Sequence, residues 1–369
     1  MQYRSPRSGR LLEADSVYSL SDGAGERWPV IDGIPYLRLG SGELSGRALE
    51  RLDAGDEAGA LELLLAENDR WWTESPPPAE QLRELIARRD ELSLRDAMAR
   101  LGWGRVGDYF AHRWSDPTFV AGLSLLDAHW SAPQSAFELA CGIGHYLRAL
   151  RKVGVHAIGA DLVFAKLWVA RHWVAPDADL ICFDADQPWP VAPRVDLAFC
   201  HDAFYFLSDK ALVASELCSA APAVALAHVH NREHHNLSGG HGMTLDELRM
   251  LFPAATIYAD EELTAAGTEQ RSPVPTSRAD TEAFGVVVGA GAARSERGPL
   301  TVPPDGTWLR RNPLCRDGLA IFPSGRYAAE YGGRITFVCS PGIPDTVTMA
   351  PEWTEAASRR ELVDLPERW

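Results

Sequence analysis

The sequence has no long apolar run and no apolar N-terminal leader. No stretch reaches the roughly 18–20 apolar residues that a membrane-spanning helix needs, and the first residues, M-Q-Y-R-S-P-R-S-G-R, are polar. A secretory signal peptide would carry an apolar core at this place. We therefore expect no membrane partner and a cytoplasmic location.

Positive charge is also in short supply. The chain has 36 Lys and Arg against 51 Asp and Glu, which gives a net charge of −15. A chain of this charge is poorly suited to binding phosphate backbones. We therefore expect no nucleic-acid partner and favour a small-molecule substrate.

Paired cysteine motifs are missing as well. None of the six cysteines forms a C-x-x-C pair, and several lie in apolar segments. This pattern favours reduced thiols over a disulfide framework or a zinc ribbon. The cysteines are Cys141, Cys182, Cys200, Cys218, Cys315 and Cys339.

Small residues gather in one stretch, A-F-E-L-A-C-G-I-G-H at 136–145. The apolar half predicts a strand, and the second half predicts a turn into a helix that begins near His145. Glycine lets a backbone approach a ligand closely, and a new helix offers free N–H groups. This combination is typical of the corner where doubly wound α/β sheets bind nucleotides.

Residues 131–292 alternate between apolar strands and helices, which predicts a parallel sheet of the α/β class. A sequence of 369 residues is long enough for about two or three domains. We expect four parts: a small β module at 1–40, a helical cap or linker at 41–130, the α/β core at 131–292 and a C-terminal β-containing extension at 293–369. The expected strands of the core lie at 136–140, 155–161, 179–183, 195–200, 223–230, 255–259 and 284–289.

Three acids fall at the ends of consecutive strands: Glu138, Asp161 and Asp184. The carboxyl ends of parallel strands meet at one sheet edge, where open α/β sheets bind ligands. A carboxylate after the second strand can accept hydrogen bonds from ribose hydroxyls. Asp184 together with Ala185 can address an adenine edge.

The core resembles class I S-adenosylmethionine-dependent methyltransferases, whose first motif is D/E-x-G-x-G-x-G. Glu138, Ala140, Gly142 and Gly144 occupy its places, with alanine for the first glycine. The resemblance implies a Rossmann-like seven-stranded sheet with helices on both faces, and S-adenosylmethionine as cofactor. The alternative cofactor, NAD, would require a third glycine after Gly144, which is absent. The implied cofactor-binding residues are Glu138, Ala140, Cys141, Gly142, Gly144, Asp161, Leu162, Asp184, Ala185 and His201.

The first 40 residues resemble the Trm112-like zinc-ribbon family. The P-x-x-D-G-I-P strand of that family matches residues 29–35, but Ser5 and Ser8 replace its first cysteine pair and Ser19 lies near the second. Without thiolates we expect no structural zinc. The resemblance implies a module that activates methyltransferases. It either shapes the active site or is a β-hairpin cap that only packs.

Histidines concentrate after two strands. His201 and Asp202 follow the fourth strand, where His201 is either a general base or a histidine held by hydrogen bonds in the loop. Five more follow the fifth strand: His228, His230, His234, His235 and His241. Three interpretations stay open: a substrate-binding and acid–base loop, a divalent metal site of His228, His230 and His234 with Glu233, or a solvated loop.

We favour the first interpretation and assign no metal. The expected catalytic residues are His201, Asp202 and His230. The expected substrate contacts are Tyr109, His228, His234, His235 and His241. Tyr109, His112 and Arg113 could face the pocket or simply belong to core and surface, and five tryptophans could form its wall: Trp71, Trp72, Trp103, Trp114 and Trp189.

The sequence therefore predicts methyl transfer to an O, N or C nucleophile of a small-molecule acceptor, with a role in specialised metabolism. Two alternatives are a non-catalytic partner subunit that keeps the fold and a protein methyltransferase. The intact acids Asp161 and Asp184 argue against the first. A homodimer is left open.

Overall fold

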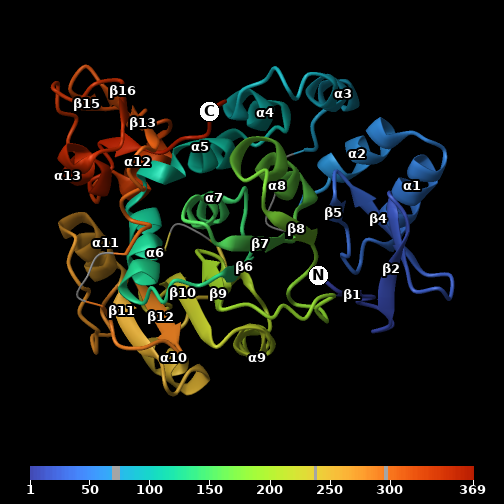
Figure 1. Cartoon of the computed structure of the whole chain (residues 1–369), viewed down its shortest axis with the longest axis horizontal. Helices are drawn as coiled ribbons and strands as arrows, with labels where there is room; N and C mark the ends of the chain where they lie inside the picture. Colours follow the sequence, from blue (N-terminus) through green and yellow to red (C-terminus); the bar gives the residue numbers. More distant parts are fainter. Residues whose placement is uncertain (69–74, 237–238, 295–297) are drawn as a thin grey trace.

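The computed structural model describes residues 1–68, 75–236, 239–294 and 298–369 (Figure 1). Within them, the centre is a seven-stranded sheet in the order β11-β12-β10-β9-β6-β7-β8. Strands β6 to β10 run parallel, and β12 runs antiparallel to both of its neighbours. The prediction of a Rossmann-like α/β sheet is confirmed. The strands are β6 (Ser135–Leu139), β7 (His156–Asp161), β8 (Asp179–Cys182), β9 (Leu197–His201), β10 (Ala223–His230), β11 (Thr256–Ala259) and β12 (Ala283–Val288).

Helices cover both faces of the sheet, as predicted (Figure 1). Side chains alternate along each strand, so Ala136 packs into one apolar cluster and Phe137 into the other. The first cluster includes α6 (Pro117–Ala128), α7 (His145–Lys152), α8 (Phe164–Val169) and α11 (Asp260–Glu269). The second includes α9 (Lys210–Ala220) and α10 (Leu245–Leu251).

The N-terminal module is an antiparallel sheet whose five strands, within the described residues, follow the chain order. Asp32 and Gly33 form the predicted hairpin turn, with φ angles of 51° and 71°. Two positive φ angles are typical of the turn that matches strand twist. The strands are β1 (Tyr3–Arg4), β2 (Leu11–Ser16), β3 (Ser19–Ser21), β4 (Arg27–Ile31) and β5 (Ile34–Pro35).

Two serines occupy the positions of the first cysteine pair of Trm112-like zinc ribbons, and both form hydrogen bonds. The hydroxyls of Ser5 and Ser8 both donate to Oε2 of Glu26, at 2.7 and 3.0 Å. These bonds join the turn between β1 and β2 to the start of β4. A carboxylate and two hydroxyls therefore link these two loops of the module.

The module also pairs with the central sheet at its β8 edge. Tyr36 forms a parallel bridge with Cys182, and the N–H of Leu37 donates to the Cys182 carbonyl at 2.7 Å. The N–H of Arg4 donates to the carbonyl of Pro190, also at 2.7 Å. This backbone pairing continues the sheet at the carboxyl end of β8 and gives the Cys182 carbonyl a partner.

The region between module and core is helical, as predicted. No helix in the described parts of the chain is long and apolar enough to cross a membrane. Trp71 and Trp72 lie outside the described residues. The helices are α1 (Gly42–Asp53), α2 (Glu57–Leu65), α3 (Ala79–Ala87), α4 (Leu94–Arg100) and α5 (Gly104–His112), followed by a 3-10 helix at Arg113–Ser115.

The C-terminal extension contains the predicted β structure and two helices. Its three-stranded sheet, within the described residues, has the order β16-β13-β17, and β14 pairs with β15. The extension lies beside α5 and α6 (Figure 1). Its elements are β13 (Trp308–Arg311), β14 (Cys315–Arg316), β15 (Leu319–Ala320), α12 (Gly325–Tyr331), β16 (Thr346–Thr348), α13 (Thr354–Ser358) and β17 (Leu362–Val363).

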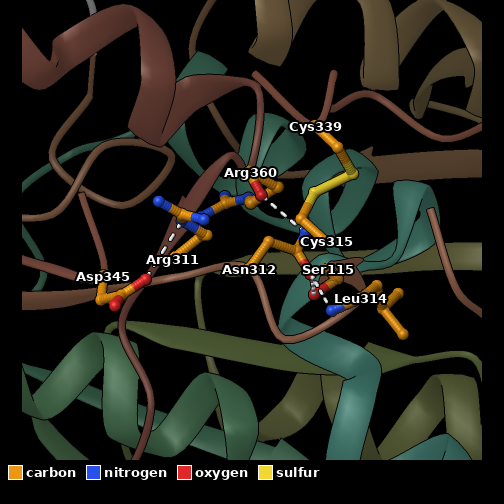
Figure 2. The surroundings of a disulfide bond; sticks show 8 residues. All are labelled: Ser115, Arg311, Asn312, Leu314, Cys315, Cys339, Asp345 and Arg360. Atoms are coloured by element: carbon orange, nitrogen blue, oxygen red, sulfur yellow. Dashed lines mark hydrogen bonds and ion pairs between the residues drawn. A yellow bond between two sulfur atoms is a disulfide. The ribbon is translucent and has the colours of Figure 1, made fainter. Parts of the chain in front are cut away.

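A disulfide joins Cys315 to Cys339, whose Cα atoms are 5.2 Å apart (Figure 2). The expectation of six reduced thiols is therefore wrong for this pair. The two cysteines are 24 positions apart, and only the loop that carries α12 brings them together. Nearby, Asn312 accepts a hydrogen bond from Ser115 at 3.0 Å and donates to the Arg360 carbonyl at 2.7 Å (Figure 2). These bonds tie the segment before the disulfide loop to the 3-10 helix at Arg113–Ser115.

Candidate active site

One cavity of about 540 Å³ opens at the carboxyl edge of the sheet. It is built by four parts of the chain: the end of the N-terminal module, α5, the strand ends of the core and α12. Its wall includes Arg38, Trp103, Tyr109, Phe110, Arg113, Glu138, Ala140, Cys141, Gly142, Asp161, Leu162, Asp184, Ala185, His201, Asp202, Tyr205, Arg326, Tyr327, Glu330 and Tyr331.

The turn after β6 adopts the left-handed backbone that glycine favours. Gly142 and Gly144 have φ angles of 56° and 85°, and Ala140 has 56°. A Cβ on Gly142 would lie 3.1 Å from a ring carbon of Phe110. Alanine at 140 thus keeps the conformation of the glycine it replaces, at a cost in strain. Gly144 shapes the turn but is not part of the cavity wall.

Asp161 holds this turn in place. Its Oδ2 accepts the N–H of Gly142 at 2.9 Å, and its Oδ1 accepts the N–H of Val163 at 2.9 Å. Nζ of Lys166 lies 3.8 Å from Oδ1. Because a carboxylate has about four acceptor positions, Asp161 can still accept hydrogen bonds from a ribose.

Glu138 is buried, and its Oε2 has no hydrogen-bond partner among the described residues. Burial raises the pKa of Glu138 well above its ordinary value, although Arg113 opposes the shift. A buried acceptor without a partner is costly. A cationic group in the cavity would satisfy it, and the methionyl ammonium of S-adenosylmethionine is such a group.

The next strand end supplies Asp184 and Ala185, which also line the cavity. Oδ1 of Asp184 accepts the N–H of Asp186 at 3.0 Å. Asp186 in turn accepts the N–H groups of Ser208 and Asp209, at 2.7 and 3.1 Å. The loops after β8 and β9 are thereby fixed to each other, and the role of Asp184 at an adenine edge stays a prediction.

Asp202 lies on the wall opposite the glycine turn and accepts three side-chain hydrogen bonds. Its Oδ2 accepts the hydroxyl of Tyr109 at 2.6 Å and Nη1 of Arg113 at 3.1 Å. Its Oδ1 accepts the hydroxyl of Tyr205 at 2.7 Å. Burial alone would raise the pKa of Asp202, but the neighbouring His228 and Arg113 lower it below its ordinary value. Asp202 is therefore ionised at neutral pH.

His201 lines the cavity, but both of its ring nitrogens are engaged. Nε2 lies 2.8 Å from the carbonyl of Thr118, and Nδ1 contacts Nη2 of Arg113. Burial and the charge of Arg113 lower the pKa of His201 far below its ordinary value. A ring that donates to a carbonyl and accepts from a guanidinium has no nitrogen left for a substrate proton. The structure thus corrects the general-base assignment and favours the hydrogen-bonded alternative.

The five histidines after the fifth strand separate into two groups. His228 and His230 are buried behind Asp202, and neither belongs to the cavity wall. His234, His235 and His241 are exposed and likewise lie outside the wall. The expected substrate contacts His228, His234, His235 and His241 and the expected catalytic residue His230 therefore do not line the cavity, whereas Tyr109 does.

Of the described tryptophans that were expected in the cavity wall, one lines the cavity and two pack elsewhere. Trp103 lines the cavity, Trp114 packs on His145 and Trp189 packs on Phe137. His112 is buried against Trp369 at the end of α5 and is not part of the wall.

Sequence reasoning missed the residues of α12. Tyr327 and Tyr331 are four positions apart, so they share one helix face and both line the cavity. The Tyr327 hydroxyl donates to Asp116 at the start of α6. The spacing could have shown their common face, but nothing local indicated which cavity that face closes.

Residues 137–220 match the family model described as Methyltransferase domain. The matched segment begins in β6 and ends with α9, so it contains the glycine turn and all three strand-end acids. The chain therefore carries a methyltransferase domain.

Solved methyltransferases share this fold at low identity. A TehB-like enzyme from Corynebacterium glutamicum is 15% identical over 46% of this chain and 88% of its own, with a TM-score of 0.36. An S-adenosylmethionine-dependent methyltransferase from Thermotoga maritima is 14% identical over 55% and 100%, with a TM-score of 0.36. A chain of the Haloferax volcanii complex of the Trm112 activator with a methyltransferase is 21% identical over 55% and 99%, also at 0.36.

No curated protein sequence matches the chain significantly.

Proposed function

We propose that the protein transfers the methyl group of S-adenosylmethionine to an O, N or C nucleophile of a small-molecule acceptor, in specialised metabolism. The observation that supports this is one cavity that joins the glycine turn to a wall made by α5 and α12. Its volume, about 540 Å³, lies within the roughly 300–1,000 Å³ typical of small-ligand sites.

The cofactor half is formed by three carboxylates. Glu138 would accept the methionyl ammonium, Asp161 the ribose hydroxyls and Asp184 the adenine side. When bound there, S-adenosylmethionine supplies an electrophilic methyl group. The chain contributes by fixing the turn around Gly142, by aligning the acceptor and by excluding water.

The acceptor half is aromatic and contains two ion pairs. It is lined by Tyr109, Tyr205, Tyr327 and Tyr331. Arg113 lies 3.1 Å from Asp202, and Arg326 lies 3.7 Å from Glu330. The hydroxyls of the first three tyrosines donate to buried carboxylates, so these rings act as walls and not as proton carriers. The ionised Asp202 would hold Tyr109 and Tyr205 in place, so that their rings orient the nucleophile of the acceptor.

We further propose that residues 1–40 are a Trm112-like module that supports the active site in the same chain. The supporting observation is Arg38, which follows β5 and lines the cavity. Its Nη1 donates to the carbonyl of Leu162 at 3.3 Å and lies 3.2 Å from Oε2 of Glu67. The module thus contacts the segment that follows Asp161.

The first experiment is a calorimetric titration with S-adenosylmethionine and S-adenosylhomocysteine. Asp161→Ala would also remove the hydrogen bond that holds the N–H of Gly142, so it would disturb the turn as well as the cofactor contact. Asp184→Asn is therefore the preferred variant. Asp179→Asn, at the exposed start of β8, is the matched control. We expect binding that Asp184→Asn weakens and Asp179→Asn leaves unchanged. Absence of binding to the unaltered protein would refute the cofactor assignment.

The acceptor is tested separately with labelled S-adenosylmethionine and panels of amines, phenols and carboxylic acids. We expect turnover of a small molecule that Tyr331→Ala reduces without changing cofactor affinity. Labelling of proteins alone, unaffected by Tyr331→Ala, would contradict the proposal.

A further inference from the structure

Two imidazoles face each other behind the acceptor wall, which is the side of the cavity formed by α5, α12 and Asp202. Nε2 of His228 and Nε2 of His230 are 3.2 Å apart. The same two atoms lie 4.0 and 3.9 Å from Oδ1 of Asp202. Both histidines are about 5–6% exposed, so the three side chains converge on one buried point.

A bulge in β10 creates this convergence. The pairing of β10 with β12 shifts register between Leu226 and Val229, and His228 has a φ of 52°. A left-handed backbone is costly for any residue with a Cβ. Bulges of this kind re-aim side chains and are frequent beside active sites. Here the bulge brings the two rings to 4.9 Å between their centroids.

A second layer fixes both rings. Oδ2 of Asp260, the first residue of α11, lies 3.0 Å from Nδ1 of His228. An ion would displace the proton on Nε2, while the proton on Nδ1 stays directed at Asp260, which is the arrangement of a carboxylate–histidine–metal group. The ring of His230 stacks on Tyr205 at 3.8 Å between centroids.

We propose that Asp202, His228 and His230 bind one divalent transition-metal ion through Oδ1 and the two Nε2 atoms. Two imidazoles and one carboxylate are typical ligands of Zn²⁺ and Fe²⁺, whereas Mg²⁺ and Ca²⁺ prefer oxygen. With bonds of about 2.0–2.2 Å, such ligand atoms lie roughly 3–3.5 Å apart. The observed separations of 3.2, 3.9 and 4.0 Å require only small inward shifts.

The ion would act on the acceptor wall through Asp202. Oδ2 of Asp202 is already held by Tyr109 and Arg113. An ion on Oδ1 would fix the other half of the carboxylate, next to the hydroxyl of Tyr205. The site lies outside the cofactor half, so it extends the proposed function without depending on it.

The test uses the full chain, stripped of metal with a chelator and titrated with Zn²⁺ and with Co²⁺. We expect one ion per chain by calorimetry, and visible absorption bands from Co²⁺ bound to nitrogen and oxygen. His230→Ala removes a ligand and should abolish this binding. Asp260→Asn keeps the three ligands and should weaken it about 10–100-fold.

His235→Ala is the matched control, because this histidine is exposed on the loop that follows. It should bind metal as the unaltered protein does. Circular dichroism of each variant checks that it folds. The proposal is wrong if the unaltered protein takes up neither ion, which is the result expected when a single proton bridges the two Nε2 atoms. It is equally wrong if His230→Ala and Asp260→Asn retain full affinity.

Discussion

The disulfide between Cys315 and Cys339 should stabilise the acceptor wall and leave the cofactor half unaffected. It closes a loop between residues 24 positions apart, and that loop contains α12. The apolar cluster around this loop is small and includes Leu314, Tyr327, Tyr331 and Phe337. For a loop of about 25 residues, the chain-entropy relation gives a stabilisation of about 3.5 kcal/mol.

The perturbation is the double variant Cys315→Ser with Cys339→Ser. If the lost cross-link acts locally, amides in the loop should exchange about 300-fold faster, because each 1.4 kcal/mol is about a factor of ten. Hydrogen exchange resolved by peptide measures this directly. Calorimetry should give an unchanged affinity for S-adenosylmethionine, since Glu138, Asp161 and Asp184 lie on the sheet.

Cys218→Ser serves as the control, because Cys218 is an exposed free thiol on α9. It should alter neither exchange nor cofactor affinity. Equal protection of the loop in the double variant and the unaltered protein would refute the reasoning. So would a loss of cofactor affinity as large as the change in the loop.

Three further outcomes are expected. Ala140→Gly should raise the free energy of unfolding by about 0.5–1 kcal/mol in urea, because relief of the left-handed strain outweighs the added entropy of the unfolded chain; a decrease would contradict the observed φ. Glu138→Gln should weaken S-adenosylmethionine about 10–100-fold by loss of a charged hydrogen bond, but should spare methylthioadenosine, which lacks the ammonium; equal losses would exclude that contact. The raised pKa of Glu138 also predicts that wild-type stability falls as pH rises above the unfolded value of about 4.3 and that Glu138→Gln removes this fall. Arg38→Ala should lower cofactor affinity several-fold, measured by calorimetry, while Arg47→Ala on α1 should not; equal affinity in both would reduce the module to a packing cap.

The central sheet could be predicted because its signals are local. Each strand of the core lies within two residues of its expected bounds, since apolar runs and the acids that follow them mark strand ends directly. The capping box of α10 is another local signal, formed by Thr244 and by Glu247 three positions later.

The acceptor wall could not be predicted because it depends on distant contacts. The state of His201 is set by Arg113 and Thr118, more than 80 positions away. The separation of His228 and His230 from the three exposed histidines follows from the bulge in β10. A run of histidines in the sequence gives no information about which side chains are buried and which are exposed.

The pairing of Tyr36 with Cys182 has a consequence for assembly. Because both strands belong to one chain, the contact is not lost on dilution, and the ratio of module to core is always one to one. A separate partner chain would instead leave β8 uncovered whenever it dissociated. Fusion therefore protects this end of the sheet at every protein concentration.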